Sequence, residues 1–254
     1  MTAKATGLKF SEKAHRYTLD GKPIPSVTTL LGKGLPKPAL PYWAAKSVAE
    51  YVVTHEADVE ALRRMGDGPM IAALKATPWE ARDTAAVRGT DIHALAEELI
   101  HGREVPVLGD LTPYVEGYVK WLDLWQPTPV LTEHIGANRK WHYAGKFDAI
   151  LTLPNGERIL ADWKTSKGVY GEVSAQLAAY RGMDFYVDVA GVDQPMPEVD
   201  SLAVVHITPT GTDLYRINDP EAAWRDWLHI QWVANSVDRI KSQIGDPSQP
   251  PEVA

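Results

Sequence analysis

The stretch that decides the fold runs from Gly145 to Thr165 and reads GKFDAILTLPNGERILADWKT. Two apolar runs flank the Asn155-Gly156 pair, a dipeptide that favours the tight turn of a β-hairpin. We therefore predict two antiparallel strands, at 143–153 and 158–165, with their charged residues gathered at one end of a sheet.

Three charged side chains of this hairpin are brought together by strand geometry. Side chains alternate between the two faces of a strand, so Asp162 and Lys164 share one face, and the turn brings Asp148 toward them. Converging carboxylates are costly unless a proton or a cation neutralises them, which suits a divalent metal beside a phosphodiester. The alternative is a surface ion pair between Asp162 and Lys164, with Asp148 a strand-end residue. The D-x-K triplet taken alone favours that alternative.

The rest of the chain switches between helical and strand patterns. An Asp20-Gly21 turn predicts an N-terminal hairpin over 15–25, and Ser26 can cap a short helix that ends near Gly32. This order of elements predicts an α/β fold in which helices flank a mixed central sheet, after a mainly helical N-terminal region. The further helices are expected at about 42–55, 59–64, 69–76, 78–100 (one helix or two abutting ones), 112–125, 172–186 and 220–244, and the further strands at 130–137, 201–208 and 212–217.

These patterns divide the chain into three parts. Residues 1–77 form an N-terminal hairpin and helical region packed on the core, and residues 78–246 form the core itself. The Pro-rich residues 247–254 read as a flexible C-terminal tail.

Composition bounds the class of protein. The 254 residues include no cysteine, which excludes disulfides, thiolate metal sites and cysteine-ligated iron–sulfur clusters. The N-terminus lacks the apolar segment of a signal peptide and no later stretch could span a membrane, so we expect a cytoplasmic protein with no membrane partner. The net charge is -7, but between Arg139 and Arg181 basic residues outnumber acidic ones, as expected where phosphate binds.

Five further positions could extend the carboxylate site. His93 and Glu97 stand four residues apart on one helix face, which fits either a pair of metal ligands or a helix-surface hydrogen bond. Glu133, in the first strand of the expected sheet, either joins the cluster or faces water. Gln176 and Tyr180 also share a helix face, but Tyr180 could equally belong to the core and Gln176 to the solvated surface.

The motifs of this chain, taken in order, resemble those of one nuclease family. They read G-x-x-x-H on a helix, G-x-x-D and D-x-K-T on strands, and Q-x-x-x-Y on a helix, as in the RecB-type branch of the PD-(D/E)XK nuclease superfamily. The leader that begins at Pro25 is similar to that of phage-encoded exonucleases of this branch. Relatives with an iron–sulfur cluster carry four cysteines, so this chain resembles the cluster-free phage type. The residues that carry the resemblance are Arg88 to His93, Glu133, Gly145 to Asp148, Asp162 to Lys167, Gln176 and Tyr180.

The resemblance implies a restriction-endonuclease-like core and a metal centre. One or two Mg²⁺ or Mn²⁺ ions would be held by His93, Asp148, Asp162 and the main-chain carbonyl of Trp163. The ions would lower the pKa of a bound water and neutralise charge at the scissile phosphate.

The resemblance also assigns catalytic and DNA-binding roles. Lys164 would position or activate the attacking water, and Gln176 and Tyr180 would orient the DNA backbone or the lysine. Asp148 and Asp162 complete the implied catalytic set. Phosphate contacts are expected at Arg88, Lys146 and Lys167, and additional acidic groups at Glu97 and Glu133.

The resulting hypothesis is a Mg²⁺- or Mn²⁺-dependent deoxyribonuclease, an exonuclease rather than an endonuclease, active in phage DNA recombination, replication or repair. Its partners would be DNA and a single-strand annealing or recombination protein, in the cytoplasm of the host cell if the chain is phage-encoded. One alternative is a catalytically silent DNA-binding or recombination-partner module of the same fold. Another is a structural or adaptor protein that uses its many tryptophans as an interaction surface.

Overall fold

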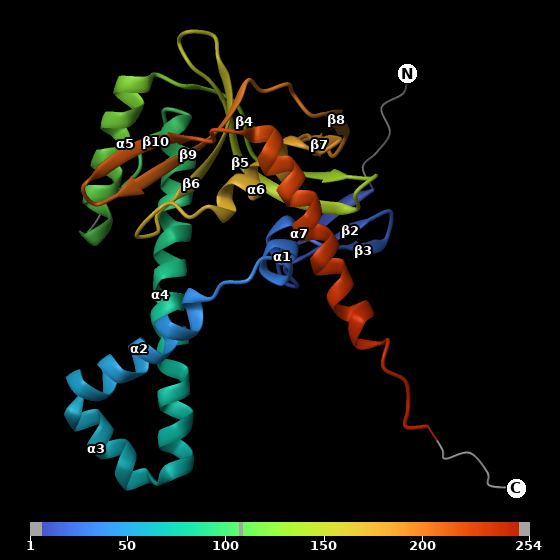
Figure 1. Ribbon diagram of the computed structural model, residues 1–254. Helices are drawn as coiled ribbons and strands as arrows, with labels where there is room; N and C mark the ends of the chain where they lie inside the picture. The colour runs from blue at the N-terminus through green and yellow to red at the C-terminus, as the bar shows by residue number, and fades with distance from the viewer. Residues whose placement is uncertain (1–6, 107–108, 249–254) are drawn as a thin grey trace, which may run out of the picture.

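The computed structural model describes residues 7–106 and 109–248 and shows an α/β fold built on a seven-stranded mixed sheet (Figure 1). The strand order is β10-β9-β6-β5-β4-β7-β8, and β6 pairs with β9 in parallel while the other neighbours are antiparallel. The predicted α/β class, with helices flanking a mixed sheet and a helical N-terminal region, is confirmed. The strands are β4 (Thr128–Asn138), β5 (Tyr143–Thr152), β6 (Arg158–Lys164), β7 (Phe185–Val187), β8 (Asp193–Pro195), β9 (Ser201–Thr208) and β10 (Gly211–Arg216).

Helices cover both faces of this sheet. Helices α1 (Val27–Gly34), α6 (Glu172–Arg181) and α7 (Pro220–Lys241) pack together on one face, around Tyr143, Leu160 and Trp227. The C-terminal part of α4 (Asp67–Ile100) and α5 (Thr112–Trp125) cover the other face, around Trp163. The short 3₁₀ helix η1 (Gly109–Leu111) leads into α5.

A small antiparallel sheet precedes the core, made of β1 (Leu8–Ser11), β2 (Arg16–Leu19) and β3 (Lys22–Ile24). The predicted hairpin and its Asp20-Gly21 turn are confirmed, because both turn residues have the positive φ that such a turn requires. The predicted cap is also confirmed, since the Ser26 side chain accepts a hydrogen bond from the main-chain N–H of Thr29. The helix that follows ends at Gly34, two residues later than expected.

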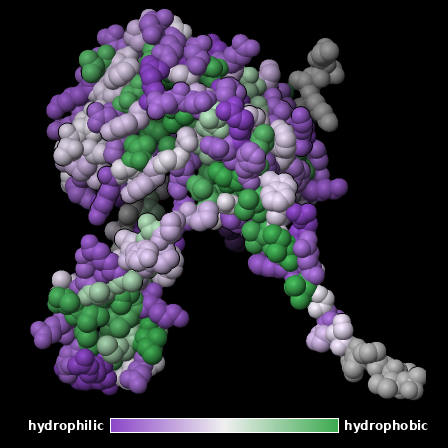
Figure 2. All heavy atoms as spheres, viewed as in Figure 1, coloured by the Kyte–Doolittle hydropathy of each residue, from purple (hydrophilic) through white to green (hydrophobic). Residues whose placement is uncertain are grey.

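Helix α4 is a single helix of 34 residues that continues through Pro78, where the sequence predicted a separate start. Its N-terminal half projects from the core and packs with α2 (Ala39–Thr54) and α3 (Glu56–Met65) (Figure 1). We call these three segments the helical arm. Figure 2 shows apolar side chains gathered on the arm. Its exposed apolar residues include Tyr42, Val53, Met65, Ile71 and Trp79.

Other elements differ from the sequence-based expectation. The helix expected over 172–186 ends at Arg181, and Phe185 starts strand β7, which extends the sheet beside β4. Strands β1 and β8 were not predicted. The boundary expected between residues 77 and 78 lies inside α4. In the expected tail, residues 247 and 248 have no regular structure and residues 249–254 lie outside the described part.

Within the described residues, no helix is both long enough and apolar enough to cross a membrane.

Candidate metal and catalytic site

Three carboxylates lie at one level on the neighbouring strands β4, β5 and β6. The β4–β5 register places Glu133 opposite Asp148. The β5–β6 ladder ends at the pair Ala149↔Ala161. Asp148 and Asp162 are the next residues along their strands, so each of the three strands contributes one acid to the row.

The central acid, Asp148, sits where the two strands separate. Its Oδ2 accepts a hydrogen bond from the main-chain N–H of Trp163 at 2.8 Å, in place of a further rung of the ladder. Strict alternation of side chains fails here: Phe147 packs in the same core cluster as Ile150, although side chains three residues apart on a regular strand lie on opposite faces. The side chain of Asp148 can therefore be approached from the α4 side of the sheet.

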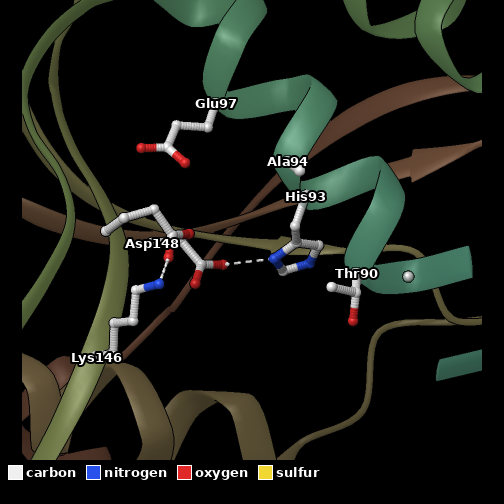
Figure 3. Close-up of a pocket in the computed structure, with 8 residues that line it drawn as sticks. Thr90, His93, Ala94, Glu97, Lys146 and Asp148 are labelled. Atoms are coloured by element: carbon white, nitrogen blue, oxygen red, sulfur yellow. Dashed lines mark ion pairs between the residues drawn. The ribbon is translucent and has the colours of Figure 1, made fainter. Parts of the chain in front are cut away.

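Helix α4 adds an imidazole to this row. The Nδ1 atom of His93 lies 3.7 Å from Oδ2 of Asp148, and Figure 3 shows the two side chains pointing toward each other. One ligand atom from each of His93, Glu133 and Asp148 lies within 4.8 Å of the other two, a spacing that could hold a metal ion. These groups line a cavity of about 410 Å³. Other residues around this cavity are Gly89, Thr90, Ala94, Glu97 and Lys146.

Two lysines neutralise the outer acids. Lys146 forms an ion pair with Glu133, and Lys164 forms one with Asp162. In the described part of the chain, no lysine or arginine forms an ion pair with Asp148, whose nearest basic partner is His93. The central carboxylate is thus the one left for a cation from solution.

Asp162 is held from the opposite face of the sheet. Its side chain is 1% exposed, and its Oδ1 accepts a hydrogen bond from Nε2 of Gln176 at 2.9 Å. The same Nε2 donates to the hydroxyl of Tyr180 at 3.2 Å. Oδ2 of Asp162 is buried, and the ammonium of Lys164 is its one partner among the described residues. Gln176 and Tyr180 therefore orient a buried acid rather than facing solvent.

Burial and charge shift the protonation of the site. The pKa of Asp162 is raised to about 7, first by burial and then by the Asp148 carboxylate. The pKa of Asp148 is raised to about 6, mainly by burial. Burial, followed by the charge of Lys164, lowers the pKa of His93, and a hydrogen bond with the main chain of Trp163 is among the opposing effects. A neutral imidazole beside carboxylates is the form in which histidine binds a metal.

Gly145 explains one motif position that sequence alone left unexplained. A Cβ atom at this residue would lie 2.7 Å from Cε1 of Tyr180, closer than real Cβ contacts. The glycine in G-x-x-D therefore makes room for the tyrosine in Q-x-x-x-Y, and two motifs far apart in sequence are packed against each other.

The remaining predicted residues are dispersed around the site. Glu97 lines the cavity one helical turn beyond His93 and is not a member of the three-residue group. Arg88 is exposed, with its Nε 3.8 Å from Asp110. Lys167 is exposed in the loop after β6. The metal-ligand group contains His93 and Asp148 as expected, together with Glu133, whereas Asp162 lies outside it.

Sequence reasoning missed Tyr17, which approaches the site from β2. Tyr17 is 8% exposed, and its pKa is raised to about 12 by burial, with added effects from Glu12 and Glu133. No motif in the N-terminal hairpin signals this contact, since it depends on how the small sheet packs against β4.

Comparisons with known proteins add little. No family model matches the chain, and no curated protein is significantly similar to it. Among solved structures, one described as "Crystal structure of SSO0001" is 17% identical, covers 80% of this chain and 86% of its own, and superposes with a TM-score of 0.35. A likeness of this degree does not bear on fold or function.

Proposed function

We propose that this chain is a metal-dependent deoxyribonuclease of the RecB-type branch of the PD-(D/E)XK superfamily. The observation that carries the proposal is the meeting of residues from four separate motifs. His93 contacts Asp148, and Lys164, Gln176 and Asp162 form one connected set beside them. An ordinary surface ion pair would not require a buried acid with an orienting amide behind it.

The donor set suits a divalent cation. Asp148 is a partly buried acid without a lysine or arginine partner among the described residues, and the buried Oδ2 of Asp162 is met there by the ammonium of Lys164 alone. Carboxylate oxygens suit Mg²⁺, and the neutral imidazole of His93 makes Mn²⁺ equally suitable. A bound ion at His93, Asp148 and Asp162 would activate water and neutralise charge on the phosphate.

Side chains of the protein would supply charge stabilisation, orientation of the acids and contacts with DNA. The ammonium of Lys164, held over Asp162, would hydrogen-bond the attacking water or the phosphate oxygens as negative charge develops. Gln176 and Tyr180 would fix the orientation of Asp162 from behind. Lys167 and Arg88, exposed near the cavity, would contact DNA phosphates.

Within this class we propose an exonuclease that acts in DNA recombination, replication or repair of a phage, together with a single-strand annealing or recombination protein. The motif order and the leader at Pro25 support this narrower assignment. A catalytically silent DNA-binding module is the competing function, and it has no need of a row of converging acids that destabilises the fold.

The proposal is tested by incubating the protein with linear and circular DNA, each with and without Mn²⁺. We expect linear DNA to be degraded only with Mn²⁺, and Lys164→Met to abolish that degradation. Lys140→Met is the matched control, because Lys140 is an exposed lysine over Trp141, outside the site. Cleavage of the circle would indicate an endonuclease, whereas DNA binding without any cleavage would support the silent module.

A further inference from the structure

We infer that Lys146 is an internal substitute for the metal ion: its ammonium holds Glu133 until a divalent cation binds beside that carboxylate and releases the lysine. The inference rests on the metal site of the proposed function and adds to it both a third acidic ligand, Glu133, and a residue that competes with the metal.

Glu133 lines the cavity of the site, and its backbone conformation is unusual for a strand residue. Its φ is +56°, in the left-handed region that residues other than glycine rarely adopt. Across the described residues, it is the one non-glycine residue with positive φ inside a strand. Such strain persists where the surrounding structure imposes it, and it gathers at functional sites.

The contacts of Glu133 show two competing uses of one carboxylate. It lies opposite Asp148 and within metal-ligand range of both Asp148 and His93. It also forms the ion pair with Lys146, in which its side chain is 20% exposed and that of Lys146 is 41% exposed. A divalent ion at the three-residue group would repel the nearby ammonium. Metal binding and the ion pair therefore oppose each other.

Release of Lys146 has a consequence for substrate binding. The lysine lines the same cavity as His93 and has a flexible, partly exposed stem. Once it leaves Glu133, its ammonium becomes available to a phosphate group at the mouth of the cavity. Lys146 is thus a positioning residue that links metal binding to DNA binding.

A double-mutant cycle on Mn²⁺ affinity tests this coupling, with Mn²⁺ titrated by calorimetry in the absence of DNA. We expect Lys146→Met to tighten Mn²⁺ binding by about fivefold or more, as for a coupling of at least about 1 kcal/mol. Glu133→Gln should weaken binding by on the order of tenfold. In the Glu133→Gln background, Lys146→Met should change the affinity by less than about twofold, because the competing pair no longer exists.

The same cycle separates displacement from a general effect of charge. Equal tightening by Lys146→Met in both backgrounds would mean that removing any positive charge suffices, and it would overturn the inference. So would an unchanged affinity in Lys146→Met, or a chain that binds no Mn²⁺ at all. Lys140→Met, on the β4–β5 turn, controls for the loss of a lysine elsewhere.

The outcome for the nuclease function is read separately, on wild-type protein with linear DNA. The predicted coupling without DNA hydrolysis would leave the displacement intact and refute the nuclease. Hydrolysis of DNA without the predicted coupling would support the nuclease and refute the displacement of Lys146.

Discussion

The main-chain N–H of Trp163 donates to Oδ2 of Asp148 at 2.8 Å, across the point where β5 and β6 stop pairing. The bond satisfies a buried donor that the end of the ladder would otherwise leave without a partner. It also fixes the orientation of the central acid by means of the main chain rather than another side chain. The first prediction follows from this double role.

Asp148→Asn and Asp148→Ala should separate the structural role of this acid from its chemical role. Both variants should lose Mn²⁺-dependent DNA hydrolysis by on the order of a hundredfold or more, because a metal ligand is removed. Asparagine keeps an oxygen for the Trp163 N–H, whereas alanine leaves it unpaired, which should cost about 1–3 kcal/mol in the free energy of unfolding. Urea denaturation measures the difference. Equal stabilities would mean that the bond contributes nothing.

Asp148 and Asp162 should make the metal-free protein less stable as pH rises from about 4 to 7. Their pKa values are raised to about 6 for Asp148 and about 7 for Asp162, above the ordinary value of 3.8. The folded state therefore holds more protons than the unfolded state in this window, and stability falls as pH increases.

Asp162→Asn isolates this effect in EDTA. Between pH 5 and pH 8, the free energy of unfolding of the variant should rise relative to that of wild type by on the order of 2 kcal/mol. One pKa unit corresponds to about 1.4 kcal/mol, and the two coupled acids share the shift. Asp213→Asn, on the exposed edge strand β10, is the control. A stability difference that does not vary with pH would contradict the prediction.

Gln176 should matter more to activity than Tyr180. The amide donates directly to Asp162, while among the described residues the tyrosine hydroxyl is linked to the acid through Gln176. Gln176→Ala should lower kcat by on the order of 10- to 100-fold, as for partners that orient a metal ligand. Tyr180→Phe keeps the buried ring and should lower kcat by less than about fivefold. A larger loss in Tyr180→Phe would give the hydroxyl a direct role.

Gly145→Ala should disturb the site through packing alone. The added methyl would lie 2.7 Å from the Tyr180 ring, and overpacking of this kind costs about 1–3 kcal/mol. Gly171→Ala is the matched control, because a Cβ there meets nothing within 4 Å and its φ is -58°. We expect thermal denaturation to show a lower Tm for Gly145→Ala only, with weaker Mn²⁺ binding. Equal Tm values for both variants would refute the packing argument.

Glu133→Gly tests whether the backbone of β4 is strained. Glycine adopts positive φ at little cost, so this variant should be more stable than Glu133→Gln by about 1 kcal/mol, although both lose the carboxylate. Chemical denaturation of the two proteins in EDTA provides the comparison. If Glu133→Gln proved the more stable, residue 133 would not be strained.

The sequence predicted those parts of the fold that depend on local chemistry. The dipeptide Asp20-Gly21 predicted the hairpin, and both residues have the positive φ that its turn requires. A hydroxyl side chain before an apolar run predicted the helix cap at Ser26. Features that depend on distant segments were not predictable in this way. Phe185 continues a helical pattern in sequence, but Ala137 of β4 offers it a strand partner. The end of α6 is therefore decided by the sheet.

The candidate site divides in the same manner. Spacing along β5 and β6 anticipated that Asp148, Asp162 and Lys164 would converge. The spacing did not predict the positive φ of Glu133, because neither the composition nor the apolar pattern of this strand signals it. Nor did it anticipate that Phe147 would leave its expected face, because that depends on where the β5–β6 ladder stops.

The helical arm and the site share one uninterrupted helix, α4. Its 34 residues form a rod about 50 Å long, with the arm on the N-terminal half and His93 on the other half. No loop separates the two, and Pro78 is the point at which the rod is weakest against bending. A displacement of the arm would therefore tilt or shift the helix at His93 as well, where the imidazole lines the cavity. Helix α4 would thus couple the position of the arm to the distance between His93 and the acids of the sheet.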